Sequence, residues 1–196
     1  MSRQVHPIER ESYRILRARH DFSGLAPLSR AVTERVCHAS ADLSFADSLV
    51  LDEDSLIHGR EALLSGAKVV CDSRMTAAGV TSRHPVVPLD DARVAEFARE
   101  SELTRSAAAM RLACADTGPG AVWVVGNAPT ALFELIERPP VHPAIVIGLP
   151  VGFVGAADAK AALASSGLRC ITNRGERGGS SVAAAAVNAL IYGVNG

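Results

Sequence analysis

The sequence has few aromatic residues and no long hydrophobic run. Phe, Trp and Tyr make up 4% of its 196 residues, whereas hydrophobic residues as a whole make up 48%. We therefore expect a core of Ala, Val, Leu and Ile, in a chain long enough to bury roughly 70% of its unfolded surface. No apolar run reaches the roughly 18–20 residues that span a bilayer, and residues 1–17 lack the apolar segment of a signal peptide. The sequence predicts no membrane segment and, by default, a cytoplasmic location.

Neither sign of charge is in excess. Lys and Arg number 20, Asp and Glu number 21, and the formal net charge is −1. Proteins that bind nucleic acid usually carry a basic excess, so we expect no nucleic-acid partner. A balanced total still allows a local site for an anionic small molecule, because local charge decides such binding.

Several common motifs of catalysis and cofactor binding are absent. The four cysteines form no CxxC pair, which argues against a zinc ribbon or a disulfide framework. We interpret them as small core residues: Cys37, Cys71, Cys114 and Cys170. The chain has no P-loop, no GxGxxG and no HExxH motif, and no GxSxG nucleophile motif. The residues therefore give no sign of a metal or nucleotide site.

Short apolar runs alternate with helical patterns. Four runs rich in β-branched residues predict buried strands at residues 67–71, 121–125, 144–148 and 168–172. Helical spacing predicts helices at residues 28–39, 104–115, 130–137, 156–165 and 180–192. The near-continuous apolarity of the runs favours a parallel sheet that is covered on both faces. We predict an α/β fold with Rossmann-like layers, in which helices flank both faces of a largely parallel sheet.

No linker-like stretch divides the chain, so we expect a single domain over residues 1–196. Residues 81–90 are interpreted as an ordered loop or a short strand. In the helix predicted at 28–39, Leu28, Val32 and Val36 share one stripe and are expected to face the core. Arg30 and Glu34 are expected on the surface.

Four segments hold candidate functional residues. Arg35 and His38 lie three positions apart near a helix end and share a face, and a histidine titrates near neutral pH, as proton transfer requires. Asn127 lies in a tight turn, residues 126–130, between a strand and a helix whose free N–H groups could bind an anion. Ser180 follows a segment with Arg174, Arg177 and paired glycines, which we interpret as an anion-binding nest with Ser180 as N-cap.

The fourth candidate is Arg105, which opposes the helix dipole in the first turn of its helix, and anion binding would explain this. Each candidate has a simpler alternative. His38 could be a surface residue that caps its helix, the two glycine-containing segments could be ordinary turns, and Arg105 could face solvent.

The strand ends carry a resemblance to a known family. Residues 36–39, 66–73, 104–108, 125–133, 148–157 and 174–180 resemble, in this order, the precorrin-8X methylmutase family, which includes the cobalt-precorrin-8 methylmutases. The strings GNAPTALF and PVGFVGAA are long and specific. The resemblance implies an isomerase of cobalamin biosynthesis that moves a methyl group from C-11 to C-12 of precorrin-8X or cobalt-precorrin-8. The product would be hydrogenobyrinic acid or cobyrinic acid.

The same resemblance implies roles for individual residues. His38 matches the histidine to which the family assigns proton transfer to the macrocycle. Four positions match residues that contact the polyacidic corrin-type substrate: Ser12, Arg35, Thr81 and Arg105. The family also implies a homodimer with sites near the subunit interface, no organic cofactor and no protein-bound metal. Asn127 and Ser180 are added as substrate-binding residues on the strength of their segments.

The chain also departs from the family pattern. A glycine commonly stands where this chain has Ala41, which affects the turn after His38, and a basic residue commonly stands where this chain has Glu176. A non-catalytic corrinoid carrier remains the main alternative, because a pocket that holds its product tightly would resemble a binding protein. A nucleotide-dependent α/β enzyme is a weaker one.

Overall fold

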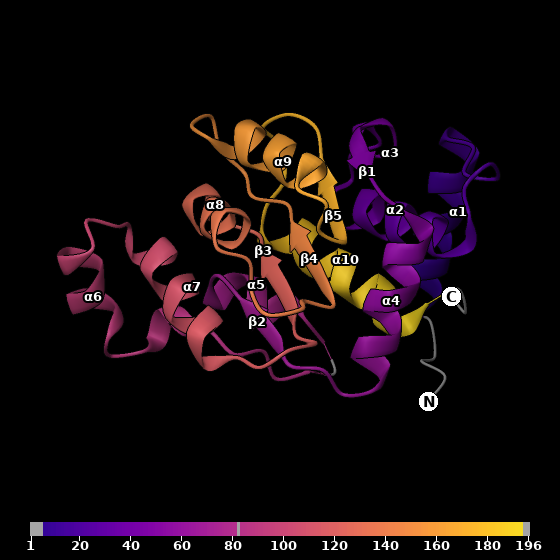
Figure 1. Cartoon of the computed structure of the whole chain (residues 1–196). Helices are drawn as coiled ribbons and strands as arrows, with labels where there is room; N and C mark the ends of the chain where they lie inside the picture. The colour runs from indigo at the N-terminus through magenta and orange to yellow at the C-terminus, as the bar shows by residue number, and fades with distance from the viewer. Residues whose placement is uncertain (1–5, 82, 194–196) are drawn as a thin grey trace.

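A five-stranded sheet forms the centre of the molecule (Figure 1). The structure is a computed structural model that describes residues 6–81 and 83–193. The strand order is β1-β5-β4-β3-β2. The strands are β1 (Leu49–Val50), β2 (Val69–Cys71), β3 (Val122–Val125), β4 (Ile145–Gly148) and β5 (Cys170–Asn173). Strands β2 to β5 are parallel, whereas β1 pairs antiparallel with β5 at one edge.

The four predicted strands are all present, and the largely parallel sheet is confirmed. The strands predicted to begin at residues 67 and 168 begin two residues later, at Val69 and Cys170. The edge strand β1 was not predicted, because two half-buried residues carry too little apolar pattern to indicate a strand.

Ten helices in the described part of the chain surround the sheet. They are α1 (Pro7–Arg19), α2 (Pro27–Ser40), α3 (Ser44–Ser48), α4 (Glu53–Leu64), α5 (Arg74–Gly79), α6 (Val94–Glu100), α7 (Arg105–Asp116), α8 (Pro129–Glu137), α9 (Ala156–Ser165) and α10 (Ser180–Tyr192), with a short 3-10 turn at Pro88–Asp90. Figure 1 shows α7, α8 and α9 on one side of the sheet and α2, α4 and α10 on the other. The predicted covering of both faces is confirmed.

Each face of the sheet has its own hydrophobic core, because side chains alternate along a strand. Val122 and Val124 of β3 pack with α2, α4 and α10, whereas Trp123 and Val125 pack with α7, α8 and α9. The predicted stripe of Leu28, Val32 and Val36 is buried in the first of these cores and is confirmed. Because all four residues of β3 are buried, the strand has no polar side.

Helix α10 lies against the sheet and has no charged residue. Its small side chains allow neighbouring elements to approach closely. A Cβ at Gly79 in α5 would lie 2.6 Å from Cβ of Ala184, so this approach requires glycine. The alanine-rich composition of α10 therefore sets how tightly α5 and α2 pack around it.

The prediction that Glu34 lies on the surface was wrong. Its side chain is buried between α1 and α2, and Arg17 and Arg30 both donate hydrogen bonds to its carboxylate. Burial raises the pKa of Glu34, but the two arginines outweigh burial and the net pKa is lowered. Helical spacing alone missed this because α1, which covers Glu34, is distant from it in sequence.

The cysteines are all free thiols and pack as expected for small residues. Cys37 and Cys71 are buried, and Cys114 and Cys170 are partly buried. Burial raises the pKa of all four thiols, to about 12 for Cys71. These thiols therefore stay protonated and weakly reactive near neutral pH.

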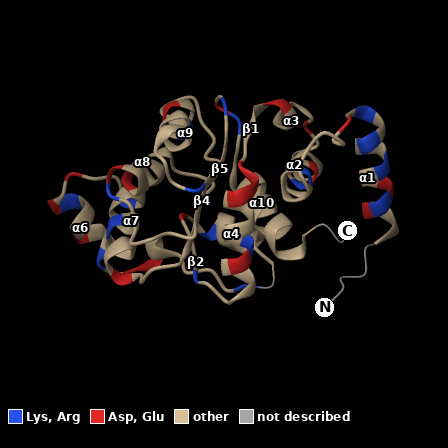
Figure 2. Ribbon diagram, turned by 45° about the vertical axis from the view of Figure 1, so that its right-hand side comes forward, with Lys and Arg blue, Asp and Glu red and all other residues tan. Residues whose placement is uncertain are grey.

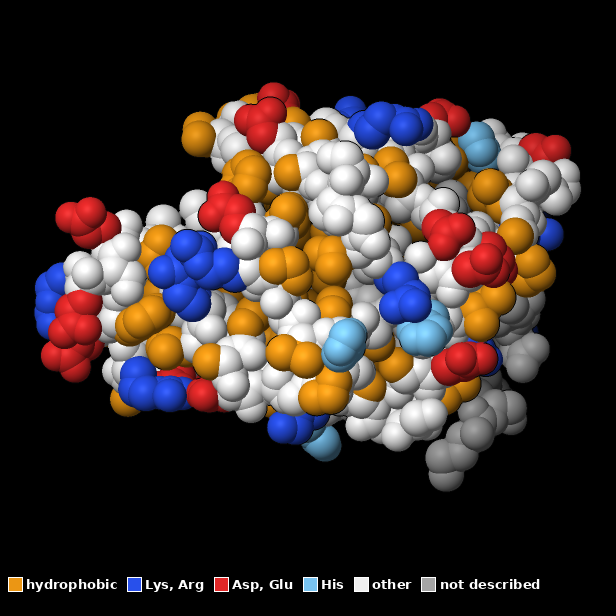
Figure 3. Space-filling model, viewed as in Figure 1, with side chains coloured by type: hydrophobic (Ala, Val, Ile, Leu, Met, Phe, Trp, Pro, Cys, Tyr) orange, Lys and Arg blue, Asp and Glu red, His pale blue; other side chains and the backbone are white. Residues whose placement is uncertain are grey.

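Most charged residues lie on the outside of the molecule, whereas Glu34, Asp72, Glu134 and Lys160 are buried. Figure 2 shows charged residues along α1 and on the outlying α6, whereas the strands carry none. On the face seen in Figure 3, acidic and basic side chains are interspersed rather than gathered into a patch of one sign. Within the described ranges, no helix is both long enough and apolar enough to cross a membrane.

Residues 81–90 were predicted as an ordered loop or a short strand. The described residues of this segment form a loop, and Ser82 lies outside the described residues. The segment contains one isolated bridge, between Val86 and Val70 of β2, and ends in the 3-10 turn. This loop carries the chain from α5 along β2 and back to the carboxyl edge of the sheet.

Candidate functional site

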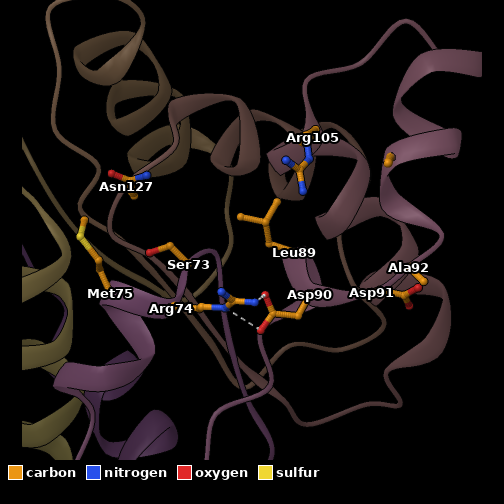
Figure 4. A pocket seen from close by; sticks show the side chains of 10 residues that line it. Ser73, Arg74, Met75, Leu89, Asp90, Asp91, Ala92, Arg105 and Asn127 are labelled. Carbon is orange, nitrogen blue, oxygen red and sulfur yellow. Dashed lines mark hydrogen bonds and ion pairs between the residues drawn. The ribbon is translucent and has the colours of Figure 1, made fainter.

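An open cavity of about 510 Å³ lies at the carboxyl edge of the sheet. Residues that follow β2 and β3 line it, together with the start of α7 and the segment around the 3-10 turn (Figure 4). The lining residues are Ser73, Arg74, Met75, Leu89, Asp90, Asp91, Ala92, Ala95, Arg105 and Asn127. Proteins with open α/β sheets bind their ligands at this edge. Two of the predicted substrate-binding residues, Arg105 and Asn127, are in this lining.

The turn that carries Asn127 is held by the carboxylate of Asp72. The backbone N–H groups of Gly126, Asn127 and Ala128 donate to this carboxylate over 3.1, 2.7 and 2.9 Å, and the hydroxyl of Thr76 donates to it over 2.8 Å. A carboxylate thus occupies these N–H groups, as the sequence suggested, but it belongs to the chain itself. The turn is therefore a rigid support for the Asn127 side chain rather than an open anion site.

Arg105 is placed for binding an anion. It is the first residue of α7, and the side chain of Thr104 caps this helix by accepting a hydrogen bond from Ala107. Figure 4 shows the guanidinium of Arg105 pointing into the cavity above Leu89. Among the described residues, no acidic side chain pairs with Arg105, whereas Arg74 in the same cavity is paired with Asp90. Arg105 is thus the arginine of this cavity that has its charge available.

Ser180 is not among the residues that line the cavity. Its hydroxyl is 3.0 Å from the hydroxyl of Thr76, which links it to Asp72. The expectation that Ser180 caps α10 was wrong, because Gly179 occupies the N-cap position and Ser180 is the first helical residue. Its role in substrate binding stays a prediction.

The arginines and glycines before α10 make contacts within the protein. Arg177 donates to the carboxylate of Asp42 over 2.6 Å, and Arg174 donates to the carbonyl of Asp47. A Cβ at Gly178 would lie 2.3 Å from the carbonyl oxygen of Leu149, so glycine is required there by the neighbouring loop. These contacts account for the segment without an anion, and they do not support its interpretation as an anion-binding nest.

His38 lies in the last turn of α2 and is partly buried. Its Nδ1 is 2.8 Å from the hydroxyl of Ser12 in α1. Its ring is stacked on Tyr13, with centroids 4.8 Å apart and planes inclined by 15°. Burial raises the pKa of Tyr13, although Arg35 opposes this effect. Two neighbouring residues of α1 therefore fix the imidazole from two directions.

The predicted shared face of Arg35 and His38 is confirmed. His38 contacts Ser12 of α1, and Arg35 forms an ion pair of 3.7 Å with Glu9, which is also in α1. The guanidinium of Arg35 also lies 5.6 Å from the centre of the Tyr192 ring. Two residues three positions apart on α2 thus face two residues three positions apart on α1.

Thr81 reaches this group through α10. Its N–H and hydroxyl donate to Oδ1 of Asn188 over 3.0 and 3.1 Å, and its hydroxyl lies 2.8 Å from that of Tyr192. Tyr192 thus contacts both Thr81 and Arg35. The sequence analysis did not select Tyr13 and Tyr192 as site residues. Their rarity was a signal, since they are the chain's two tyrosines.

Apart from Ser180, the predicted site residues therefore fall into two groups. Ser12, Arg35, His38 and Thr81 form one group, the histidine cluster, which Tyr13 and Tyr192 hold together. Arg105 and Asn127 line the cavity, and within the described residues no member of the histidine cluster is in that lining.

Comparison with known proteins places the chain in a family. A model of the family described as precorrin-8X methylmutase matches residues 7–193. The chain is 41% identical to the precorrin-8X methylmutase of Pseudomonas aeruginosa, with 96% of this chain and 95% of the relative covered. It is 37% identical to the cobalt-precorrin-8 methylmutase of Salmonella typhimurium, with the same coverage of both.

A solved structure agrees with these sequence matches. The crystal structure of the precorrin-8X methylmutase from Thermus thermophilus superimposes with a TM-score of 0.84 at 35% identity, over 93% of each chain. The chain therefore belongs to the precorrin-8X methylmutase family, whose enzymes are isomerases of cobalamin biosynthesis that move a methyl group within one molecule.

Proposed function

We propose that this enzyme moves a methyl group from C-11 to C-12 of precorrin-8X or cobalt-precorrin-8 and forms hydrogenobyrinic acid or cobyrinic acid. The relatives include enzymes named for precorrin-8X and enzymes named for cobalt-precorrin-8, which supports either compound as the substrate. The proposed substrate is a large, flat ring that carries several carboxylates. It requires a site that offers both cationic donors and an apolar surface.

In the proposed mechanism, the imidazolium of His38 gives a proton to the macrocycle. The protonated ring is electron-poor, so the bond from C-11 to the methyl group breaks as the bond to C-12 forms. The proton then returns to the imidazole or to solvent, and the substrate and product remain isomers. The observation that carries this role is the orientation of His38 by Ser12 and Tyr13, because a proton donor must be held in a defined geometry.

Arginines and polar side chains are proposed to hold the carboxylates of the ring. Arg105 has its charge available in the cavity and would form charge-assisted hydrogen bonds with one of them. Asn127 stands on the turn that Asp72 makes rigid, so its amide is already oriented. Arg35, Thr81 and Ser180 are proposed as further substrate contacts.

The proposal includes a homodimer with its sites near the interface between the two copies. The division of the predicted residues into two groups supports a dimer. In a dimer, the histidine cluster of one copy can lie beside the cavity of the other copy. Light scattering at micromolar concentration is expected to give twice the chain mass of 20.5 kDa. A mass of one chain would contradict the dimer.

The test of the catalytic role compares wild type, His38→Ala and His58→Ala in the conversion of precorrin-8X, followed by visible absorption. His58 is an exposed histidine on α4 and serves as the matched control. His38→Ala is expected to lower turnover by about 10²–10⁴-fold, whereas His58→Ala should behave as wild type. Turnover that survives in His38→Ala would refute the role of His38.

The same samples distinguish an isomerase from a carrier. Titration with hydrogenobyrinic acid is expected to give saturable binding in wild type and in His38→Ala, because the histidine is assigned to proton transfer rather than to affinity. A wild-type protein that binds this product but converts no precorrin-8X or cobalt-precorrin-8 would be a corrinoid carrier.

A further inference from the structure

The loop between β4 and α9 exposes hydrophobic side chains at the carboxyl edge of the sheet. Phe153 is 91% exposed, Val154 is 89% exposed and Val151 is 47% exposed. Met75, which follows β2 at the same edge, is 65% exposed. Single exposed hydrophobic residues are ordinary on a protein surface, but a group of them at one edge indicates a contact surface.

The backbone of this loop is anchored although its side chains are exposed. The N–H of Gly152 donates to the carbonyl of Glu176 over 3.1 Å, and the N–H of Gly179 donates to the carbonyl of Leu149 over 2.8 Å. Gly155, with a φ of 74°, turns the chain into α9. The exposed position of Phe153 is therefore set by the fold, and no core contact explains it.

The end of the loop lies against the start of α8, close to a residue that lines the cavity. A Cβ at Gly155 would lie 3.7 Å from Cβ of Pro129, the first residue of α8. Asn127, two residues earlier, lines the cavity beside Met75, as Figure 4 shows. The loop and the cavity are therefore near each other at the start of α8, and Arg105 is in the lining of the cavity.

We propose that Phe153, Val151, Val154 and Met75 form an apolar platform that contacts one face of the tetrapyrrole ring. This inference rests on the proposed function. The ring has flat apolar faces and a carboxylate rim. The side chain of Phe153 has no polar atom and is suited to the apolar face, whereas the guanidinium of Arg105 is suited to a carboxylate of the rim. An aromatic ring stacks favourably on another flat π-system, so the platform and Arg105 together would set the orientation of the substrate.

The test uses substitutions at exposed positions, where folding is little affected. Val154→Ser is matched by Val141→Ser, because Val141 is 56% exposed in the loop before β4, at the opposite edge of the sheet. Phe153→Ser removes the aromatic ring and Phe153→Tyr retains it. Each variant is titrated with hydrogenobyrinic acid and assayed with precorrin-8X, and its mass is measured by light scattering.

We expect Phe153→Ser to raise Kd and KM by about tenfold, with kcat within about twofold of wild type, because a contact with the ring face is made in ground state and transition state alike. Phe153→Tyr should restore wild-type Kd and KM. Val154→Ser should raise Kd more than Val141→Ser, which should leave it unchanged.

Two results would overturn the platform. One is a Phe153→Ser variant that binds the product as tightly as wild type. The other is a Phe153→Ser variant whose mass falls to that of one chain while binding persists, since the loop would then be an interface between copies. A wild-type protein that neither binds nor converts these corrin compounds would instead remove the proposed function, and this inference with it.

Discussion

The hydroxyl of Ser12 lies 2.8 Å from Nδ1 of His38, across 26 positions of sequence and between two helices. This hydrogen bond, together with the stacked ring of Tyr13, makes α1 part of the arrangement that we propose for catalysis. The orientation of the imidazole therefore depends on how α1 packs against α2.

Ser12→Ala is expected to lower kcat by about tenfold, because without this hydrogen bond the imidazole keeps its stacking on Tyr13 but loses the contact that fixes Nδ1. The loss should be smaller than that of His38→Ala, and the double variant should be no worse than His38→Ala alone, since Ser12 acts through His38. Steady-state assays of the three variants check this, with Ser165→Ala on α9 as control. Additive losses would show that Ser12 acts independently.

Ala41→Gly is expected to stabilise the protein by about 1 kcal/mol, because Ala41 ends α2 in the left-handed region, with a φ of 52°. The matched control is Ala161→Gly at an exposed position inside α9, where glycine should cost about 1 kcal/mol. Urea unfolding measures both. A loss of stability in both variants would contradict the strain assigned to Ala41.

Asp72→Ala is expected to destabilise the protein by about 3 kcal/mol, because three N–H groups and one hydroxyl lose a buried acceptor. Affinity for hydrogenobyrinic acid should fall as well, since Asn127 loses its support. Asp90→Ala removes an exposed ion pair with Arg74 and should change stability far less, because solvent screens such a pair. Equal effects of the two variants on urea unfolding would refute the role of Asp72.

Lys160 predicts a pH dependence of stability. It is fully buried, and its Nζ donates to the carbonyl of Arg177 over 2.5 Å and to Oδ1 of Asn173 over 3.1 Å. Burial lowers its pKa from 10.5 to about 8, an effect that the nearby Glu176 partly opposes. Between these two pKa values the unfolded chain binds more protons than the folded one, so this group's contribution to stability rises with pH.

The measurement is urea unfolding of wild type, Lys160→Met and Lys68→Met from pH 7 to pH 10. The stability of wild type relative to Lys160→Met should rise across this range, by up to about 3 kcal/mol for a fully developed shift. The exposed Lys68 should show no such trend when replaced. Parallel pH curves for wild type and Lys160→Met would contradict the lowered pKa.

The local pattern of the sequence determined most of the fold. Runs such as residues 121–125 are apolar throughout, and only a strand covered on both faces accommodates such a run, so the parallel sheet and its helices could be predicted. The spacing of Arg35 and His38 likewise determined that they share a face, because helical geometry is local. The family resemblance in the strand ends indicated the reaction type.

Only the tertiary structure decided which partner each polar group meets. Glu34 is buried because α1 covers it. Asp72 binds the turn after β3 because β2 and β3 are neighbours in the sheet. Tyr192 contacts Thr81 because α10 lies beside α5. These contacts join residues far apart in the chain, and no local pattern encodes them. They depend on how the layers pack, which is a property of the whole core rather than of any segment.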